Sequence, residues 1–174
     1  MRVQLSLIQG TSFEVSVIQL LGKKFPEARF LHNLQVYSYD LQKMTQVDVV
    51  MIHPCGIIAI ETKDWREFVR GGYSLDKWIG KGRSRNTLEV FSPVYQNWIH
   101  CRALWSSALR SAILLPYIHN VVCVPDSTRI ESECEEVCLY SYLTHKVDSI
   151  TRLASTTIDP DQLIQRLEEA KCWE

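Results

Sequence analysis

The chain has 174 residues, of which 46% are hydrophobic and 22% are charged, and its formal net charge is −1. This composition is typical of a globular protein, and we expect residues 1–174 to form a single domain with one substantial core. The near-zero charge excludes a global positive field for nucleic acid, so any phosphate-binding surface must be local. No uncharged apolar run is long enough for a transmembrane helix, and the N-terminal residues do not resemble a signal peptide, so we expect no membrane partner.

The six cysteines, at positions 55, 101, 123, 134, 138 and 172, contain no C-x-x-C pair. Cys134 and Cys138 have no matching pair of His or Cys residues nearby, which argues against a zinc site. Most of the cysteines lie in apolar contexts, where a reduced cysteine behaves as a small hydrophobic residue. Reduced cysteines favour a cytoplasmic location.

A helix is predicted at residues 10–25, where apolar side chains recur at helical spacing. Thr11 or Ser12 can cap its N-terminus, and Pro26 ends it. Glu14 lies in the first turn, where a carboxylate interacts favourably with the helix dipole. Taken alone, that interaction is a sufficient reason for a charge at this position.

Three strands are predicted next, at residues 29–39, 46–53 and 57–63. The second and third are separated by His53-Pro54-Cys55-Gly56, which has the residue pattern of a type I turn. Both of these strands are apolar on both faces, which is typical of central strands in a sheet covered on both sides.

The turn sets the register of the second and third strands. A two-residue loop pairs His53 with Gly56, and the same register places Asp48 directly opposite Glu61. The two side chains would then lie on one face, about 5 Å apart. A bulge at Gly56 would shift this pairing by one residue, and the sequence leaves that alternative open.

Residues 64–91 are more basic than the rest of the chain, because the stretch from Lys63 to Arg85 contains seven basic residues and three acidic ones. We predict a short hairpin with a basic loop, whose return strand is anchored by Trp78. The basic side chains are either solvated or available to DNA phosphates, which they would contact without reading bases. The candidate phosphate contacts are Lys77, Lys81, Arg83 and Arg85.

A long helix is predicted from Ser92 to about Ser111, with Ser92 as the N-cap and Pro93 as the first helical residue. The remaining elements are strands at 118–124 and 136–140, separated by an acidic loop, and a final helix at 160–171 capped by Asp159. Strands interspersed with helices and the absence of any linker indicate a single α/β domain.

The charged residues in the apolar strands need an explanation, because an unpaired buried charge costs several kcal/mol. On a strand, Glu61 and Lys63 project from the same face, beside Asp48 of the neighbouring strand. Two carboxylates this close repel each other, and a divalent cation such as Mg²⁺ relieves that repulsion. Two acids, an ammonium group and a metal are what phosphodiester hydrolysis requires. The alternative is a buried ion network that only fixes the register of the strands.

Several short motifs follow one another in the chain: Gly10 with Glu14, Gln46-Val47-Asp48, Pro54-Cys55-Gly56, Ile60-Glu61-Thr62-Lys63, Arg70-Gly71-Gly72 with Trp78, and Ser92-Pro93 followed by Gln96-Asn97 and His100. As an ordered set they resemble the nuclease-related domain (NERD) family of the PD-(D/E)xK nuclease superfamily, over about residues 10–104. The chain departs from the family pattern at Phe13, where a second glycine is usual, and in its basic loop at 80–88. The resemblance implies a restriction-endonuclease-like fold, with a central mixed β-sheet flanked by helices.

The resemblance also implies roles for single residues. Asp48 and Glu61 would bind Mg²⁺ or Mn²⁺, with the backbone carbonyl of Thr62 as a third ligand. Lys63 would orient the attacking water, and Glu14 would reach the metal through a water molecule.

Three more residues match the family pattern. Gln96 and His100 lie one turn apart on a helix, so both would act at the phosphate or brace the site, and a structural role suits them equally well. Gln96 is grouped with the catalytic residues, and His100 and Gln46 with the candidate nucleic-acid contacts.

The implied activity is metal-dependent cleavage of DNA, in DNA processing, repair or defence. A homodimer or a helicase-type partner is compatible with the resemblance. Two alternatives stay open: a module of the same fold that binds nucleic acid or protein without cleavage, and a purely structural partner in a larger assembly. The intact set of Asp48, Glu61 and Lys63 favours the nuclease.

Overall fold

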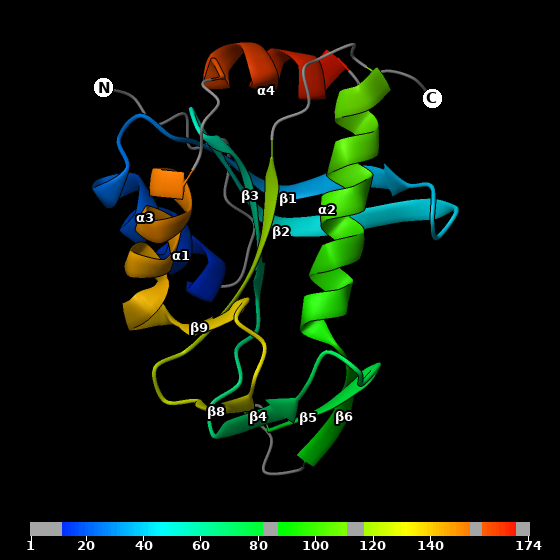
Figure 1. Ribbon diagram of the computed structural model, residues 1–174, viewed down its shortest axis with the longest axis vertical. Coiled ribbons are helices and arrows are strands. Elements are labelled where there is room, and N and C mark those ends of the chain that lie inside the picture. The colour runs from blue at the N-terminus through cyan, green and yellow to red at the C-terminus, as the bar shows by residue number, and fades with distance from the viewer. Residues whose placement is uncertain (1–11, 82–86, 111–116, 154–157, 170–174) are drawn as a thin grey trace.

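The computed structural model describes residues 12–81, 87–110, 117–153 and 158–169 (Figure 1). Six strands follow the first described helix, three more follow the second, and two helices come last. In order, they are α1 (Ser12–Lys24), β1 (Arg29–Ser38), β2 (Lys43–His53), β3 (Gly56–Thr62), β4 (Phe68–Gly71), β5 (Lys77–Lys81), β6 (Thr87–Phe91), α2 (Pro93–Arg110), β7 (Ile118–Val124), β8 (Arg129–Ser132), β9 (Val137–Leu139), a 3₁₀ turn (Tyr140–Tyr142), α3 (Leu143–Leu153) and α4 (Pro160–Glu169).

The main sheet has the strand order β1-β2-β3-β7-β9, antiparallel through β3 and parallel beyond it. One face packs against α1 and α3, and the other against α2 and α4. The predicted central position of β2 and β3 is confirmed, and all seven residues of β3 are buried. Side chains alternate between the two cores, with Ile58 and Ile60 on one face and Ile57 and Ala59 on the other.

The predicted register of β2 and β3 is confirmed. His53 pairs with Gly56, Val49 pairs with Ile60, and the ladder between these two pairs is continuous. Gly56 has a φ of +144°, and a Cβ at this position would lie 2.5 Å from the carbonyl oxygen of Tyr117. The turn therefore requires glycine for both its backbone conformation and its space.

The predicted basic hairpin is part of a second sheet, with the strand order β6-β5-β4-β8, at the lower end of the molecule in Figure 1. Trp78 of β5 is fully buried there and packs so closely that a Cβ at Gly71 would overlap its indole ring. Strand β8 pairs in parallel with β4 and lies within the segment predicted to be an acidic loop. The part of the basic loop that contains Arg83 and Arg85 lies outside the described residues.

Two of the predicted helix caps, Ser92 and Asp159, are confirmed. The Ser92 hydroxyl accepts a hydrogen bond from Tyr95 N–H at 3.2 Å at the start of α2, and Asp159 accepts one from Asp161 N–H at 3.0 Å at the start of α4. Helix α3 was not predicted, although Leu143 and Val147 bury its apolar side against α1. None of the described helices combines the length and the apolar character that crossing a membrane requires.

Candidate active site

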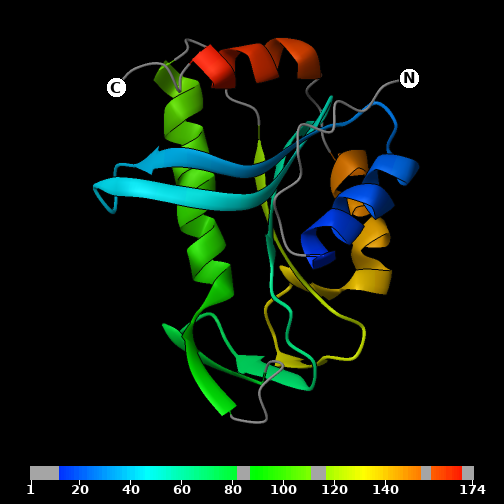
Figure 2. The ribbon, with the colours of Figure 1, turned by 180° about the vertical axis from the view of Figure 1, so that it is seen from behind.

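The β1–β2 ladder is interrupted at one point beside the candidate site. His32 pairs with Val49 and Leu34 with Val47, whereas Asn33 and Asp48 between them are not paired. Asn33 has a φ of +52°, the left-handed conformation that asparagine tolerates better than most residues. Beyond this point β1 and β2 extend together past α2 as an arm (Figure 2).

Two amide side chains hold this irregular point. Gln46 Nε2 donates a hydrogen bond to Asn33 Oδ1 at 2.7 Å, and Gln35 Nε2 donates one to Gln46 Oε1 at 2.8 Å. Gln46 is exposed, and its predicted contact with nucleic acid stays a prediction. In the structure its amide braces the backbone opposite Asp48.

Asp48 turns from β2 towards the end of β3. Its Oδ2 accepts hydrogen bonds from the Thr62 N–H at 2.9 Å and from the Thr62 hydroxyl at 3.1 Å. Burial and the nearby charge of Glu61 raise the pKa of Asp48 from its ordinary 3.8 to about 6, although the hydrogen bond from Thr62 N–H acts in the opposite direction. The two carboxyl groups are thus close enough to repel each other, as the register suggested.

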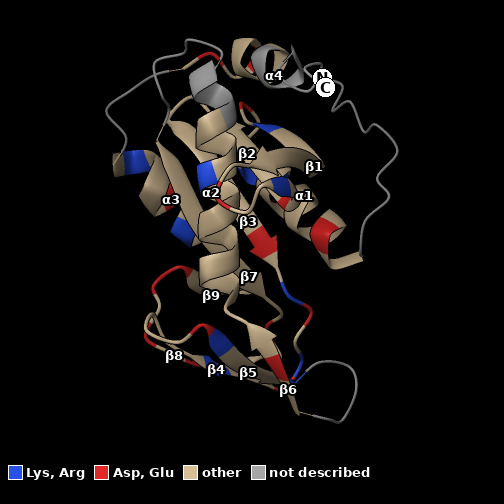
Figure 3. Cartoon of the chain, turned by 90° about the vertical axis from the view of Figure 1, so that its right-hand side faces the viewer, with Lys and Arg blue, Asp and Glu red and all other residues tan. Residues whose placement is uncertain are grey.

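Glu61 is almost completely buried, with 1% of its surface exposed. Its Oε1 lies 2.6 Å from Lys63 Nζ, which also donates a hydrogen bond to Gln96 Oε1 at 3.2 Å. The other oxygen, Oε2, lies 3.3 Å from His100 Nδ1, but the two atoms are not aligned as a hydrogen bond and both remain without a hydrogen-bond partner. Glu61 therefore has an unused lone pair in the interior of the site. Figure 3 shows an acidic stretch of ribbon at the end of β3, followed by a basic one.

His100 is almost completely buried, with 2% of its surface exposed. It faces Glu61 from α2, which suits the bracing role, and its assignment as a nucleic-acid contact stays a prediction. Asn97, one turn earlier, donates hydrogen bonds to the carbonyl oxygens of Ala59 and Val121 at 2.9 and 3.0 Å. This side chain joins α2 to β3 and β7, which fixes the distance of Gln96 and His100 from the site.

Glu14 approaches the site from α1 on the other face of the sheet. It is buried, its charge contributes to the raised pKa of Asp48, and its Oε2 lies 2.7 Å from His32 Nε2. The interaction with the helix dipole is thus not the only reason for a carboxylate at position 14. His32 was not predicted as a site residue, because a lone histidine in a predicted strand carries no signal by itself.

The two described lysines of the basic segment form ion pairs within the second sheet. Lys81 Nζ lies 2.6 Å from Glu67, and Lys77 is paired with Glu89. Neither lysine is brought close to Asp48 or Glu61 by a contact that the structure shows. Lys77 is exposed and Lys81 is half-buried, and either lysine would have to exchange its carboxylate partner to contact a phosphate.

The fold and these side chains define a mixed α/β domain of the restriction-endonuclease type with two sheets flanked by helices. The nuclease-related domain matches residues 9–125, and the chain belongs to this family, a member of the PD-(D/E)xK-like nuclease superfamily. Its function is accordingly nuclease-related. The chain is also similar to an uncharacterized protein of Bacillus anthracis, with 25% identity over 150 residues that cover 85% of this chain and 70% of the relative. No solved structure matches the chain significantly.

Proposed function

We propose that the chain is a divalent-metal-dependent nuclease that hydrolyses DNA phosphodiester bonds at the site formed by Asp48, Glu61 and Lys63. The observation that carries this proposal is the convergence of two carboxylates and one ammonium group at the end of β3, where Glu61 is buried and the pKa of Asp48 is raised. Such perturbed carboxyl groups are typical of functional sites. The matching family supports the reaction class.

The side chains present suit a hard cation. Mg²⁺ is commonly held by one or two carboxylates together with water and substrate oxygens, so a cluster of three protein carboxylates is not required. Within the described residues, no group of three or more His, Cys, Asp or Glu side chains is arranged to hold a metal. Mg²⁺ or Mn²⁺ would bind the Glu61 Oε2 atom that lacks a hydrogen-bond partner, and its charge would favour the ionised form of Asp48. The Thr62 carbonyl oxygen would be the third protein ligand.

When bound, the metal would act as a Lewis acid and lower the pKa of a coordinated water. Lys63 Nζ, positioned by Glu61 Oε1 and Gln96 Oε1, would orient the attacking water and offset the negative charge that develops on the phosphate. Glu14, held by His32, would act through a water molecule from the α1 side. DNA processing, repair or defence in the cytoplasm would be the setting of this activity.

The proposal is tested by incubating the purified chain with plasmid, linear duplex and single-stranded DNA, in Mg²⁺, Mn²⁺ or EDTA. We expect cleavage that requires a divalent metal and is lost in Lys63→Ala, while Lys24→Ala, which removes an exposed lysine at the end of α1, cleaves normally. Equal cleavage by wild type and Lys63→Ala would refute the assignment. Salt-sensitive DNA binding with no cleavage in any metal would identify a non-cleaving module instead.

A further inference from the structure

Exposed aromatic side chains form a continuous row at the start of α2. Phe91 and Tyr95 lie with ring centroids 5.4 Å apart, and Tyr95 stacks on Trp98 at 5.5 Å with an interplanar angle of 19°. The guanidinium of Arg102 lies over the Trp98 ring, 4.8 Å from its centroid. Trp105 lies on α2 two turns after Trp98. We call the rings of Phe91, Tyr95, Trp98 and Trp105 the aromatic ladder. Its four rings are 42–46% exposed, which is unusual for side chains of this size.

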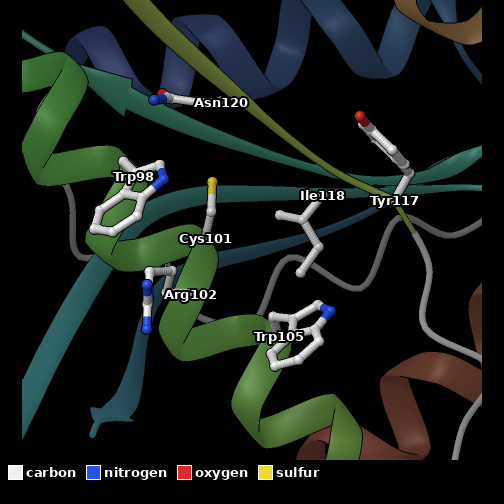
Figure 4. Close-up of a pocket in the computed structure, with 7 residues that line it drawn as sticks. All are labelled: Trp98, Cys101, Arg102, Trp105, Tyr117, Ile118 and Asn120. Atoms are coloured by element: carbon white, nitrogen blue, oxygen red, sulfur yellow. The ribbon is translucent and has the colours of Figure 1, made fainter. Parts of the chain in front are cut away.

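A hollow of about 380 Å³ adjoins the ladder. It is lined by Trp98, Arg102 and Trp105 of α2, and by Tyr117, Ile118 and Asn120 at the start of β7 (Figure 4). The hollow is shallow and largely open to solvent, and Tyr117 at its edge is 71% exposed. The ladder and the hollow share Trp98, so they form one surface.

The side chains of this surface suit a ligand that combines flat rings with an anionic group. Arg102 is the one charged side chain among the residues that line the hollow. It is balanced by Asp40 at the tip of the β1–β2 arm, whose Oδ2 lies 2.6 Å from Arg102 Nε. The pair is bidentate, because Arg102 Nη2 also donates a hydrogen bond to Asp40 Oδ1 at 2.9 Å, so a phosphate would have to displace the carboxylate from both contacts. Proteins that bind single-stranded nucleic acids combine aromatic rings with arginine side chains, because every base has a face that can stack on an aromatic ring.

The ladder also lies beside the candidate active site. Gln96 and His100 face Lys63 and Glu61, while Tyr95 and Trp98 occur on the same turns of α2 but point away to solvent. The two sets of side chains therefore lie on opposite sides of one helix, which is about 10–12 Å across with its side chains. A nucleic-acid strand that occupies the site would reach the ladder by passing around α2.

We propose that the aromatic ladder binds a single-stranded segment of nucleic acid by base stacking, with Arg102 contacting a phosphate. This inference rests on the proposed nuclease function, because it specifies the substrate as one that contains unpaired nucleotides. It does not depend on cleavage, since stacking needs no metal.

The test measures binding of fluorescent oligothymidine and of a duplex of equal length by anisotropy, in EDTA. We expect the single strand to bind more tightly, and Trp98→Ala or Trp105→Ala to weaken its binding by about 5- to 150-fold each. Tyr142→Ala, which removes another exposed aromatic ring, should leave binding unchanged. Asp40→Asn should strengthen binding, because it frees Arg102 for phosphate.

Unchanged oligonucleotide binding in both tryptophan variants, with the fold confirmed by circular dichroism, would overturn the proposal. So would a change in self-association alone, measured by sedimentation, because it would identify the ladder as a protein-docking surface. Ladder-dependent binding without cleavage would refute only the nuclease. Metal-dependent cleavage with binding that ignores the ladder would refute only this inference.

Discussion

Asp48→Asn should stabilise the metal-free protein at neutral pH. The pKa of Asp48 is raised from 3.8 to about 6 in the folded chain, so its ionised form is less favourable there than in the unfolded chain. A shift of this size corresponds to about 3 kcal/mol, because one pKa unit is about 1.4 kcal/mol. Asparagine removes the charge, and its Oδ1 can still accept the hydrogen bond from Thr62 N–H.

The sign of the pH dependence follows from this raised pKa. Below the unfolded pKa of 3.8, Asp48 is protonated in both states and causes no loss of stability. As pH rises through about 6, the folded chain must ionise a buried carboxyl group, and the free energy of unfolding decreases. The difference between Asp48→Asn and wild type should therefore be near zero at acid pH and largest at neutral pH.

Chemical denaturation of both proteins in EDTA, repeated across this pH range, measures the difference. A gain of about 3 kcal/mol at neutral pH corresponds to about 6–12 °C in melting temperature for a chain of this size. An Asp48→Asn protein that is equally or less stable than wild type at neutral pH would refute the reasoning, because it would show that Asp48 is not held in an unfavourable ionised state.

Three further predictions follow from the same contacts. Mg²⁺ or Mn²⁺ should raise the melting temperature of wild type but not of Asp48→Asn, and equal shifts in both would place the metal elsewhere. His32→Ala should weaken Mn²⁺ binding by about 10- to 100-fold, because it releases Glu14, and calorimetry measures this affinity. His32→Gln should restore part of the affinity. Unchanged affinity in His32→Ala would exclude this role for His32. Gly56→Ala should lower the free energy of unfolding by about 1–3 kcal/mol or more, since its Cβ would overlap the Tyr117 carbonyl and its φ is +144°, and a stable variant would show that the turn can rearrange.

The central hairpin could be predicted because its signals are local. The turn residues fix the pairing of His53 with Gly56, and the apolar character of both strands fixes their central position, so the approach of Asp48 to the end of β3 followed directly. The helix caps at Ser92 and Asp159 could also be predicted from the sequence, since a cap is a contact between residues two or three positions apart.

Two of the unpredicted features depend on contacts between distant parts of the chain. The bond between His32 and Glu14 joins a strand to a helix, and neither residue signals the other in the sequence. The burial of His100 depends on where α2 crosses the sheet, which Asn97 fixes through β3 and β7. Helix α3 was missed although Leu143, Val147 and Ile150 recur at helical spacing, a signal that the sequence does carry.

The metal-ligand role given to Glu61 is testable in one comparison. Single-turnover cleavage of labelled DNA in saturating Mn²⁺ should be slower in Glu61→Gln than in wild type by at least about 10²-fold, the loss usual when a catalytic group is removed. The variant must keep its cooperative unfolding, so that the loss reports on the site. Cleavage at the wild-type rate by a folded Glu61→Gln protein would contradict a metal-dependent nuclease at the end of β3.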